Sequence, residues 1–445
     1  MPCMRFSDLR GHHVAIWGFG REGQAAYRRC REVGVTPVVA EPDLAAPPDY
    51  DALSGEDGIH ALLEAEIVIK SPGVPVTHPL YAQLRGQGTL ITSVTDLWLS
   101  ENADRTIAIT GTKGKSTTSA LIHHLLGRLG SRSALLGNIG SPVLDEPQPP
   151  ADIVVLEVSS YQAQSLTTSP RWAVVTSLFP EHLTWHGSED AYYNDKLHLI
   201  DGGPEWVLSA PAPDLLARLE QRLPATSELL TLGPATVHVE AADVVWPGGH
   251  RISASALPLV GTHNAGNIAL AINAVGRLLN LDLDASADRL ADALTTFQPL
   301  AHRLETVPSD DGRRWIDDGL ATAPAAVVAS IEALASDSLC VIVGGADRGL
   351  DFAPLLDFLR ADGTGLQVVL IGAAGRRIAD QLEDDRVAAS WHVEDSFASA
   401  ACWAHSAENP ARTVLLSPGA PSQDEYRDYV ERAEAFRRIA LGGES

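Results

Sequence analysis

The chain has 445 residues, enough for about three domains, and its 45% hydrophobic and 20% charged residues are typical of a globular protein. Its 33 Lys and Arg against 57 Asp and Glu give a net charge of −24. A field of this sign repels nucleic acids and anionic membranes, which excludes both as general partners.

Cysteine usage and hydropathy are typical of a cytoplasmic protein. The four cysteines, Cys3, Cys30, Cys340 and Cys402, lie far apart and have neither a metal-binding nor a disulfide-framework spacing. No apolar run reaches the roughly 18 residues that a membrane helix needs. We expect a cytoplasmic monomer without membrane insertion.

Residues 1–94 have the pattern of a Rossmann-like domain. A strand at 13–17 runs into the turn GFGREG, and a helix follows, then a second strand that ends at Glu41. Another strand at 65–70 leads into the turn Ser71-Pro72-Gly73. A glycine turn at a helix N-terminus binds diphosphate, because N–H groups and the helix dipole face the anion. With an acidic residue about 20 positions later, the turn also matches the NAD fingerprint, so an NAD-dependent oxidoreductase is one hypothesis.

Residues 95–300 form a second α/β segment, which contains the stretch TIAITGTKGKST. In a G-x-x-x-x-G-K-[ST] loop, backbone N–H groups surround phosphate oxygens, the lysine reaches the β- and γ-phosphates, and the hydroxyl binds Mg²⁺. The second half of this pattern stands at 111–116, between a strand at 106–110 and a helix at 117–129, and Ile109 replaces the first glycine. This junction predicts an ATP-binding loop. A P-loop ATPase that joins no substrates is a further hypothesis.

Five more motifs follow the loop in chain order. They are Glu157 near the end of a strand at 152–160, Glu181-His182 after a strand at 172–178, Lys196 in a helix, GTHNAGN at 261–267, and His302-Arg303. A carboxylate at a strand tip that faces a phosphate loop is a suitable Mg²⁺ ligand, because this hard cation takes oxygen ligands. Taken singly, a histidine at a strand end is more often a structural residue.

The loop and these motifs together resemble the Mur ligase superfamily, which includes ATP-dependent amide ligases. The resemblance implies an α/β fold of three domains: a Rossmann-like one at 1–94, a central P-loop domain with a parallel sheet at 95–300, and a Rossmann-like one at 301–445. Strands in the last domain are expected at 313–318, 338–345, 366–372 and 413–419. The resemblance also implies ATP and Mg²⁺ as cofactors.

Residue by residue, the resemblance assigns the ATP and metal sites. The metal ligands would be Ser116, Glu157, His182 and Lys196, the last after carbamylation by CO₂, and the catalytic residues would be Lys115, His182, Lys196 and Arg303. The ATP-binding residues would be Gly111, Thr112, Lys113, Gly114, Lys115, Ser116, Thr117, Asn264, Asn267, Arg303 and Asp318. The Arg303 cation would stabilise charge on the transferring phosphoryl group.

The first domain narrows the branch of the family. Folylpolyglutamate synthetases lack such a domain, whereas the glutamate-adding branch uses it to bind UDP-N-acetylmuramoyl-L-alanine. The resemblance assigns this binding to Gly18, Phe19, Gly20, Arg21, Glu41, Ser71, Pro72, Gly73 and Asn138. In the implied reaction, ATP phosphorylates the alanine carboxylate, and the glutamate amine then attacks the acyl phosphate.

The third domain departs from the family pattern where glutamate should be held. Members that add D-glutamate carry N-D-S-K-A-T, whereas residues 317–322 read DDGLAT, so that Leu320 replaces the lysine. A second family lysine, after Gly344-Gly345, is replaced by Arg348, whose planar fork binds carboxylates differently. We therefore expect a rebuilt pocket that accepts L-glutamate, with D-glutamate as the alternative. The glutamate-binding residues would be Thr322, Arg348, Ser422 and Tyr429.

Overall fold

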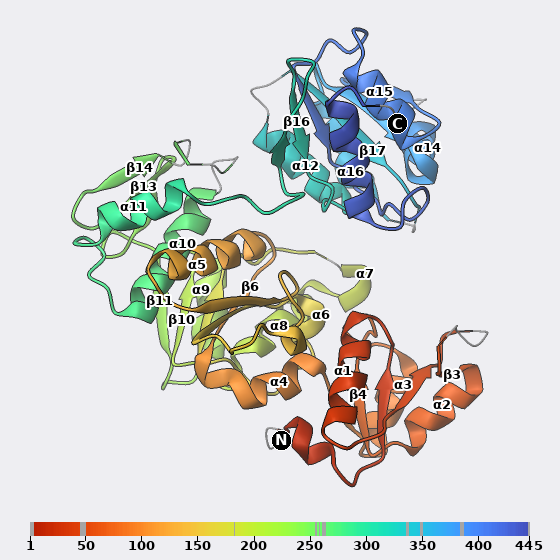
Figure 1. The fold of residues 1–445 in the computed structure, drawn as a ribbon, viewed down its shortest axis with the longest axis vertical. Coiled ribbons are helices and arrows are strands. Elements are labelled where there is room, and N and C mark those ends of the chain that lie inside the picture. Colours follow the sequence, from red (N-terminus) through yellow and green to blue (C-terminus); the bar gives the residue numbers. More distant parts are fainter. Residues whose placement is uncertain are drawn as a thin grey trace. The chain divides into compact units, whose positions relative to one another are not determined.

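The computed structural model describes residues 4–443, except 45–49, 182, 254–255, 258, 260–263, 335–337, 348–349 and 383–386. The chain divides into two compact units, Met1–Leu257 with His263–Phe297, and Pro258–Thr262 with Gln298–Ser445. Both units have the α/β architecture that the sequence predicts (Figure 1). The first unit holds two parallel sheets, one on each side of residue 94 in the sequence, and the two expected boundaries between the three domains stay a prediction.

The first sheet is five-stranded and parallel, in the order β3-β2-β1-β4-β5. Its strands are β1 (Val14–Trp17), β2 (Val38–Glu41), β3 (Leu53–Ser54), β4 (Ile67–Lys70) and β5 (Leu90–Thr92). The helices of this region are α1 (Arg21–Glu32), α2 (Gly55–Glu64), α3 (Pro79–Gly86) and α4 (Val94–Asn102). The central β1 is buried throughout, which explains why its sequence, VAIW, is a continuous apolar run.

The second sheet of this unit is six-stranded and parallel, in the order β11-β10-β9-β6-β8-β7. Its strands are β6 (Thr106–Thr110), β7 (Ser133–Gly137), β8 (Ile153–Glu157), β9 (Trp172–Val175), β10 (Trp206–Ser209) and β11 (Glu228–Thr231). The helices are α5 (Lys115–Arg128), α6 (Ser160–Ala163), α7 (Leu183–His186), α8 (Glu189–Leu197), α9 (Pro213–Arg222), α10 (Asn264–Leu279) and α11 (Ala287–Thr295). A small antiparallel sheet, β12 (His238–Glu240), β13 (Asp243–Val245) and β14 (Arg251–Ser253), completes the unit.

Three element ends near the predicted ATP loop differ from the expectation, and the first is the strand expected at 152–160, which ends at Glu157. The strand expected at 172–178 ends at Val175. The N–H of Thr176 still donates to the Thr110 carbonyl of β6, whereas Ser177 bonds to the loop. The carbonyl of Ser177, for example, accepts the N–H of Thr112 at 2.9 Å. The helix expected from residue 117 begins at Lys115, so the lysine and Ser116 belong to its first turn.

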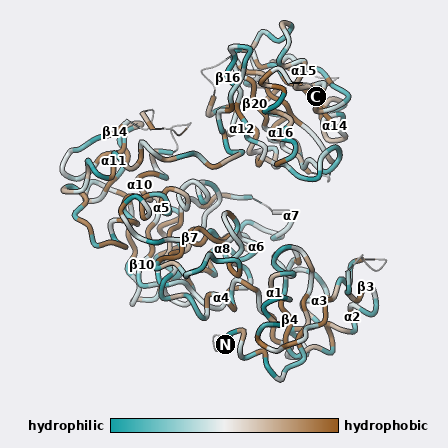
Figure 2. The backbone as a smooth tube through the Cα atoms, viewed as in Figure 1, coloured by the Kyte–Doolittle hydropathy of each residue, from teal (hydrophilic) through white to brown (hydrophobic). Residues whose placement is uncertain are grey.

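The second unit contains one six-stranded sheet, in the order β15-β16-β20-β17-β18-β19. Its strands are β15 (Glu305–Val307), β16 (Arg314–Asp317), β17 (Leu339–Gly344), β18 (Gln367–Ile371), β19 (Ser390–Val393) and β20 (Thr413–Leu416), and β15 alone among them pairs antiparallel. The helices are α12 (Pro324–Ala333), α13 (Ala353–Ala361), α14 (Gly372–Leu382), α15 (Phe397–His405) and α16 (Tyr429–Ala440). The four predicted strands are confirmed, and apolar runs follow strands such as β20 in Figure 2.

Candidate active site

The predicted ATP loop joins the buried central strand β6 to the N-terminus of α5, as expected. Two glycines give the loop its shape. Gly111 (φ +143°) and Gly114 (φ +85°) adopt backbone conformations that favour glycine. A Cβ atom at Gly111 would lie 2.1 Å from Oγ1 of Thr176, and one at Gly114 would lie 2.4 Å from Oδ1 of Asn267. Neither position has room for a side chain.

Contacts with the segment after β9 fix the outer half of the loop. The N–H groups of Thr112 and Lys113 donate to the carbonyl and hydroxyl oxygens of Ser177, both at 2.9 Å. The buried Tyr192 hydroxyl donates to Oγ1 of Thr112 at 3.0 Å, and Lys113 forms an ion pair with Glu181. The first-turn N–H groups of α5 have no carbonyl four residues earlier in the helix, so this end of α5 suits an anion.

Two lysine ammonium groups meet at one carbonyl of the loop. Nζ of Lys115 donates to the carbonyls of Gly111 (2.9 Å) and Thr112 (3.0 Å), and Nζ of Lys196 donates to the same Gly111 oxygen at 2.9 Å. Lys196 is only 1% exposed and lies 4.8 Å from the centre of the Tyr192 ring. Burial, and then the positive charge of Lys115, lower the pKa of Lys196 well below its usual value. A lysine in this setting deprotonates readily, as carbamylation requires.

Glu157 stands where a metal ligand is expected. It ends β8, is paired in register with Ile109 of β6, and is fully buried. One carboxylate oxygen accepts the side-chain amide of Asn138 at 2.7 Å, whereas Oε2 has no hydrogen-bond partner in the described part of the chain. A buried carboxylate oxygen without a partner suits a hard cation such as Mg²⁺. The buried Ser116 belongs to the first turn of α5, and His182, the other expected ligand, lies outside the described residues.

A buried histidine that was not among the predicted site residues, His186, lies beside this site. Nδ1 of His186 lies 2.6 Å from Oδ2 of Asp195, and Nε2 lies 3.1 Å from Oγ of Ser160, so the imidazole links α7, α8 and α6. Its side chain has no exposed surface. Asp195 precedes Lys196 in α8, and the histidine therefore holds the helix that carries the lysine. The spacing of His186, four residues after His182, was the available signal.

Helix α10 brings the two predicted nucleotide-binding asparagines to the loop. It packs against α5, and Oδ1 of Asn267 accepts the hydroxyl of Thr118 at 3.3 Å. Nδ2 of Asn267 donates to Oδ1 of Asn264 at 2.8 Å, and both asparagines are buried. The close approach of Asn267 to Gly114 places an amide beside the phosphate-loop backbone. The residues before it in the motif, 261–263, lie outside the described residues.

The first sheet assembles a second glycine turn. Gly18 (φ +90°) is contacted by Ser71, whose hydroxyl donates to the Gly18 carbonyl at 2.6 Å. A carboxylate oxygen of Glu41 accepts the N–H of Phe19 at 2.7 Å and the hydroxyl of Tyr50 at 2.8 Å. Glu41 thus holds the turn itself, which differs from the ribose contact that the NAD fingerprint assigns to such an acid.

The other residues predicted to bind UDP divide between two places. Gly20 caps the N-terminus of α1, which begins at the exposed Arg21, and Pro72 and Gly73 follow Ser71 in the turn after β4. The Asn138 side chain donates to Glu157 at the end of β8, at 2.7 Å, and its role in UDP binding stays a prediction. Asn138 therefore supports the expected metal ligand.

In the second unit, Arg303 lies between two residues with left-handed backbone, His302 (φ +61°) and Leu304 (φ +47°). Such residues are strained unless their surroundings fix them. Nδ1 of His302 lies 2.7 Å from Oδ2 of the fully buried Asp317, and the N–H of Leu304 donates to Oδ1 of Asp318 at 3.3 Å. Burial raises the pKa of Asp318 to about 6. Both carboxylates hold the backbone around Arg303.

One of the predicted glutamate-binding residues, Tyr429, lies beside this segment. The Tyr429 ring packs edge-on against His302, with 5.4 Å between ring centres. Ser422 is buried and Thr322 is exposed. Arg348, the predicted cation of the group, lies outside the described residues.

Three side chains near Arg303, one imidazole and two carboxylates, form a cluster. The guanidinium group of an arginine lies against both carboxylates. Ligand atoms of His302, Glu305 and Asp317 lie within 4.8 Å of one another. The guanidinium of Arg437 lies 2.6 Å from Glu305 and 3.5 Å from Asp317. We therefore interpret the cluster as a salt-bridge network that stiffens the segment.

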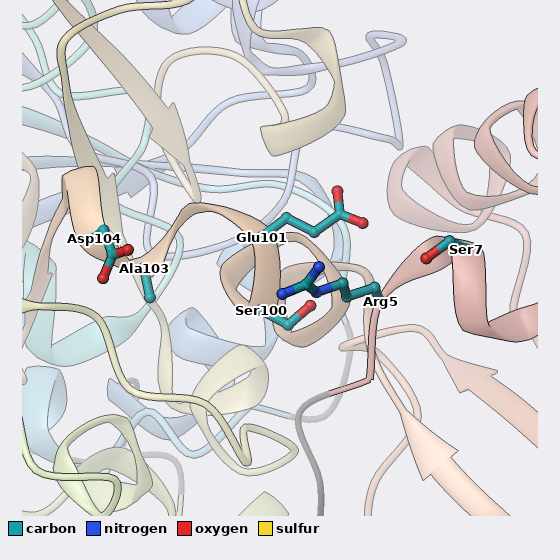
Figure 3. Close-up of a pocket in the computed structure, with 6 residues that line it drawn as sticks. All are labelled: Arg5, Ser7, Ser100, Glu101, Ala103 and Asp104. Atoms are coloured by element: carbon teal, nitrogen blue, oxygen red, sulfur yellow. The ribbon is translucent and has the colours of Figure 1, made fainter.

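A separate pocket of about 310 Å³ lies between the start of the chain and the end of α4 (Figure 3). Its lining residues are Arg5, Ser7, Ser100, Glu101, Ala103 and Asp104. They include none of the residues predicted to bind ATP, metal, UDP or glutamate. In the described part of the chain, every helix is too short or too polar to span a bilayer.

Comparison with known proteins gives matches over the whole length. The Mur ligase middle domain matches residues 109–275. The chain is 44% identical to the UDP-N-acetylmuramoyl-L-alanine–L-glutamate ligase of a Micromonospora species, over 97% of each chain. It is 42% identical to the ligase of the same name from Salinispora tropica, over 97% of this chain and 98% of the relative. The solved MurF ligase of Thermotoga maritima in complex with ADP is similar in fold, with a TM-score of 0.57, 16% identity and coverage of 98% of each chain.

These matches agree with the order of motifs from the ATP loop to Arg303. The alignment with the two relatives extends over nearly the whole of each chain, so it spans the region of the glycine turn in the first sheet and that of residues 317–322 in the second unit as well. The chain belongs to the Mur ligase family.

Proposed function

We propose that this protein joins L-glutamate to UDP-N-acetylmuramoyl-L-alanine, with conversion of ATP to ADP and phosphate, in peptidoglycan precursor synthesis. The observation that carries the proposal is the loop at 111–116, where Lys115, Lys196 and the start of α5 gather around one carbonyl next to Glu157. The names of the relatives support L-glutamate as the acceptor. D-glutamate is the alternative that the family pattern leaves.

Side chains and backbone groups of the protein would bind the phosphates of ATP and neutralise the charge that develops during phosphoryl transfer. The first-turn N–H groups of α5 and the Lys115 ammonium would bind the phosphates of ATP, and Lys115 would neutralise the charge that develops on the transferring γ-phosphoryl group. Arg303 is proposed as a second cation for the same charge. A carboxylate needs this activation, because an amine cannot displace oxide from it. The amine of glutamate would then attack the acyl phosphate, and phosphate would leave.

Ser116 and Glu157 would hold Mg²⁺, since a hydroxyl in the first turn of α5 and a buried carboxylate oxygen without a partner are suitable ligands. Bound there, Mg²⁺ would supply charge stabilisation for phosphoryl transfer. His182 and carbamylated Lys196 are proposed as further ligands. Carbamylation joins CO₂ to the neutral Lys196 amine and releases one proton.

The first sheet is proposed to bind the UDP part of the substrate. The turn at Gly18 and Phe19 precedes the N-terminus of α1, which suits a diphosphate. Ser71 and Glu41 hold the backbone of this turn in place. These contacts support a role for the turn in nucleotide binding.

One assay tests the function. Purified protein with ATP, Mg²⁺ and UDP-N-acetylmuramoyl-L-alanine is given L-glutamate or D-glutamate separately, and the product is identified by mass. We expect product with L-glutamate and none from the Lys115→Ala variant. Product with D-glutamate only would contradict L-glutamate as the acceptor, whereas the proposed ligase activity would stand.

The same assay separates the other classes of function. A P-loop ATPase without ligase activity would release ADP at a rate that neither the muramoyl nucleotide nor glutamate changes. An oxidoreductase would bind NAD tightly and release no ADP. Either result would contradict the proposal.

A further inference from the structure

A buried arginine in the second unit lacks the partners that such a charge requires. Arg432 of α16 is 1% exposed, and its Nε has no hydrogen-bond partner among the described residues. The one hydrogen bond found for its guanidinium in that part of the chain is a long one, 3.5 Å from Nη2 to the Gly319 carbonyl. Burial lowers the pKa of Arg432 to about 10, although nearby acids such as Asp424 and Asp317 oppose the shift. A buried guanidinium whose N–H groups lack close acceptors is costly, so this site favours a ligand that supplies acceptor oxygens.

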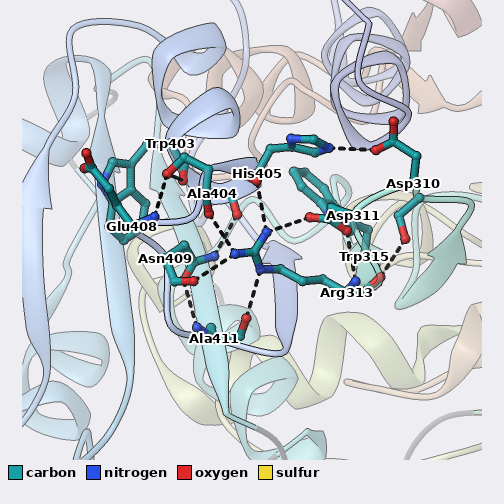
Figure 4. Close-up of polar contacts among 12 residues, drawn as sticks. Asp310, Asp311, Arg313, Trp315, Trp403, Ala404, His405, Glu408, Asn409 and Ala411 are labelled. Carbon is teal, nitrogen blue, oxygen red and sulfur yellow. Dashed lines mark hydrogen bonds and ion pairs between the residues drawn. The ribbon is translucent and has the colours of Figure 1, made fainter.

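Arg313, in the same unit, shows how a structural arginine forms a full set of hydrogen bonds (Figure 4). Its guanidinium donates to Asp311 and to four backbone carbonyls. These carbonyls belong to His405, Ser406, Asn409 and Ala411, which lie at and after the end of α15. All three guanidinium nitrogens are engaged. Arg432 lacks such a set.

Arg432 lies beside residues that follow the carboxyl ends of two strands of this sheet. Gly319 follows the carboxyl end of β16, and Gly345 follows that of β17. Both residues are glycines, so no side chain fills either position. A Cβ atom at Gly345 would lie 3.3 Å from Nη1 of Arg432. In open parallel α/β sheets, ligands bind outside the carboxyl ends of the strands.

Residues predicted to bind glutamate lie on the same side. Tyr429 precedes Arg432 by three residues in α16, which puts both on one face of the helix. A Cβ atom at Gly319 would lie 3.9 Å from the Tyr429 carbonyl. Gly319 also precedes Leu320, the residue that replaces the lysine of D-glutamate-adding members.

We infer that Arg432 binds a carboxylate of the incoming glutamate. Glutamate brings two carboxylates, and Leu320 removes one cation from the family pattern, so another cation is needed. A guanidinium with an unpartnered Nε offers a planar fork that matches a carboxylate bidentately. The inference rests on the proposed function for the identity of the amino acid.

The test compares wild type with Arg432→Gln and Arg432→Lys, and with Arg438→Gln as a control, because Arg438 is an exposed arginine of the same helix. The KM for L-glutamate, for ATP and for UDP-N-acetylmuramoyl-L-alanine is measured for each. We expect Arg432→Gln to raise the KM for L-glutamate about ten- to a hundredfold and to leave the other two within about twofold. Arg432→Lys should be intermediate, and Arg438→Gln should match wild type.

Melting curves provide a readout without turnover. L-glutamate should raise the melting temperature of wild type and of Arg438→Gln, but not that of folded Arg432→Gln. If wild type forms product while Arg432→Gln keeps its KM for L-glutamate, or loses all three affinities equally, the inference is wrong and the function stands. If wild type forms no product but L-glutamate still stabilises it through Arg432, the function fails and the site stands.

Discussion

Lys115 and Lys196 donate to the same carbonyl oxygen, that of Gly111, each at 2.9 Å. Two ammonium groups on one acceptor repel each other, and the buried one is more easily deprotonated. Lys115 is partly exposed and lies at the start of α5, where a phosphate is expected. Lys196 is buried in α8, where a neutral amine is expected. Two lysines that share one acceptor are thus expected to have different roles, phosphate binding for Lys115 and carbamylation for Lys196.

The first prediction concerns CO₂. Because burial lowers the pKa of Lys196, its amine loses its proton more easily than an exposed lysine does, and the carbamate should form. Removal of CO₂ and bicarbonate should lower ligase activity, and added bicarbonate should restore it. With ¹³C-labelled bicarbonate, wild type should show a carbamate signal that Lys196→Arg lacks. Lys113→Arg serves as the control, since Lys113 is 44% exposed and should leave the signal unchanged.

The second prediction concerns Gly114. Gly114→Ala and Gly130→Ala both force a side chain onto a left-handed residue (φ +85° and +90°), which costs about 1–2 kcal/mol. Gly130 has open space around its Cβ position, whereas that of Gly114 lies 2.4 Å from Asn267. Only Gly114→Ala should therefore weaken ATP binding, by at least about tenfold in a calorimetric titration. Equal ATP affinities in the two variants would contradict the close packing of Asn267 on the loop.

The third prediction concerns the pH dependence of stability. Burial raises the pKa of Asp318 from its ordinary value of 3.8 to about 6, so the folded state holds the proton more tightly than the unfolded state. The contribution of Asp318 to the free energy of unfolding is therefore fully present below pH 3.8, the pKa in the unfolded state, and is lost as the pH rises through 6, the pKa in the folded state. The shift corresponds to about 3 kcal/mol, at about 1.4 kcal/mol per pKa unit.

Asp318→Asn should remove this loss, because an amide stays neutral. Urea unfolding at pH 4 and pH 7.5 should show a smaller decrease in the free energy of unfolding for the variant than for wild type. Since the Asp318 carboxylate also accepts bonds from Ser330, Ser417 and the Leu304 N–H, the variant is expected to lose activity. An identical pH profile for both proteins would be the contrary result.

The fourth prediction concerns Arg313. Arg313→Lys keeps the charge but has no planar fork to reach Asp311 and the four carbonyls at the end of α15, so it should destabilise the protein by about 2–4 kcal/mol. Arg412→Lys, at an exposed arginine, is the control and should be nearly neutral. Denaturant unfolding of both variants provides the comparison. A neutral Arg313→Lys would mean that the network adds nothing to stability.

Most of the fold follows from the sequence, because parallel strands buried on both faces are continuous apolar runs. β6, β8, β17 and β20 were all predicted as strands for this reason. The end of β9 was predicted three residues too far, at Leu178 instead of Val175. The backbone of Ser177 bonds to the ATP loop instead of to a strand, and no local pattern encodes such a long-range contact.

The sequence by itself determined the ATP loop, the order of the later motifs and the replacement of the family lysine by Leu320. These depend on residue type and spacing along the chain. Tertiary structure decided that Asn138 bonds to Glu157, that His186 holds the helix of Lys196, and that Arg432 lies buried with an Nε that has no partner in the described part of the chain. The physical reason is that hydrogen bonding and desolvation depend on distances between groups far apart in the chain, and only the packed fold sets those distances.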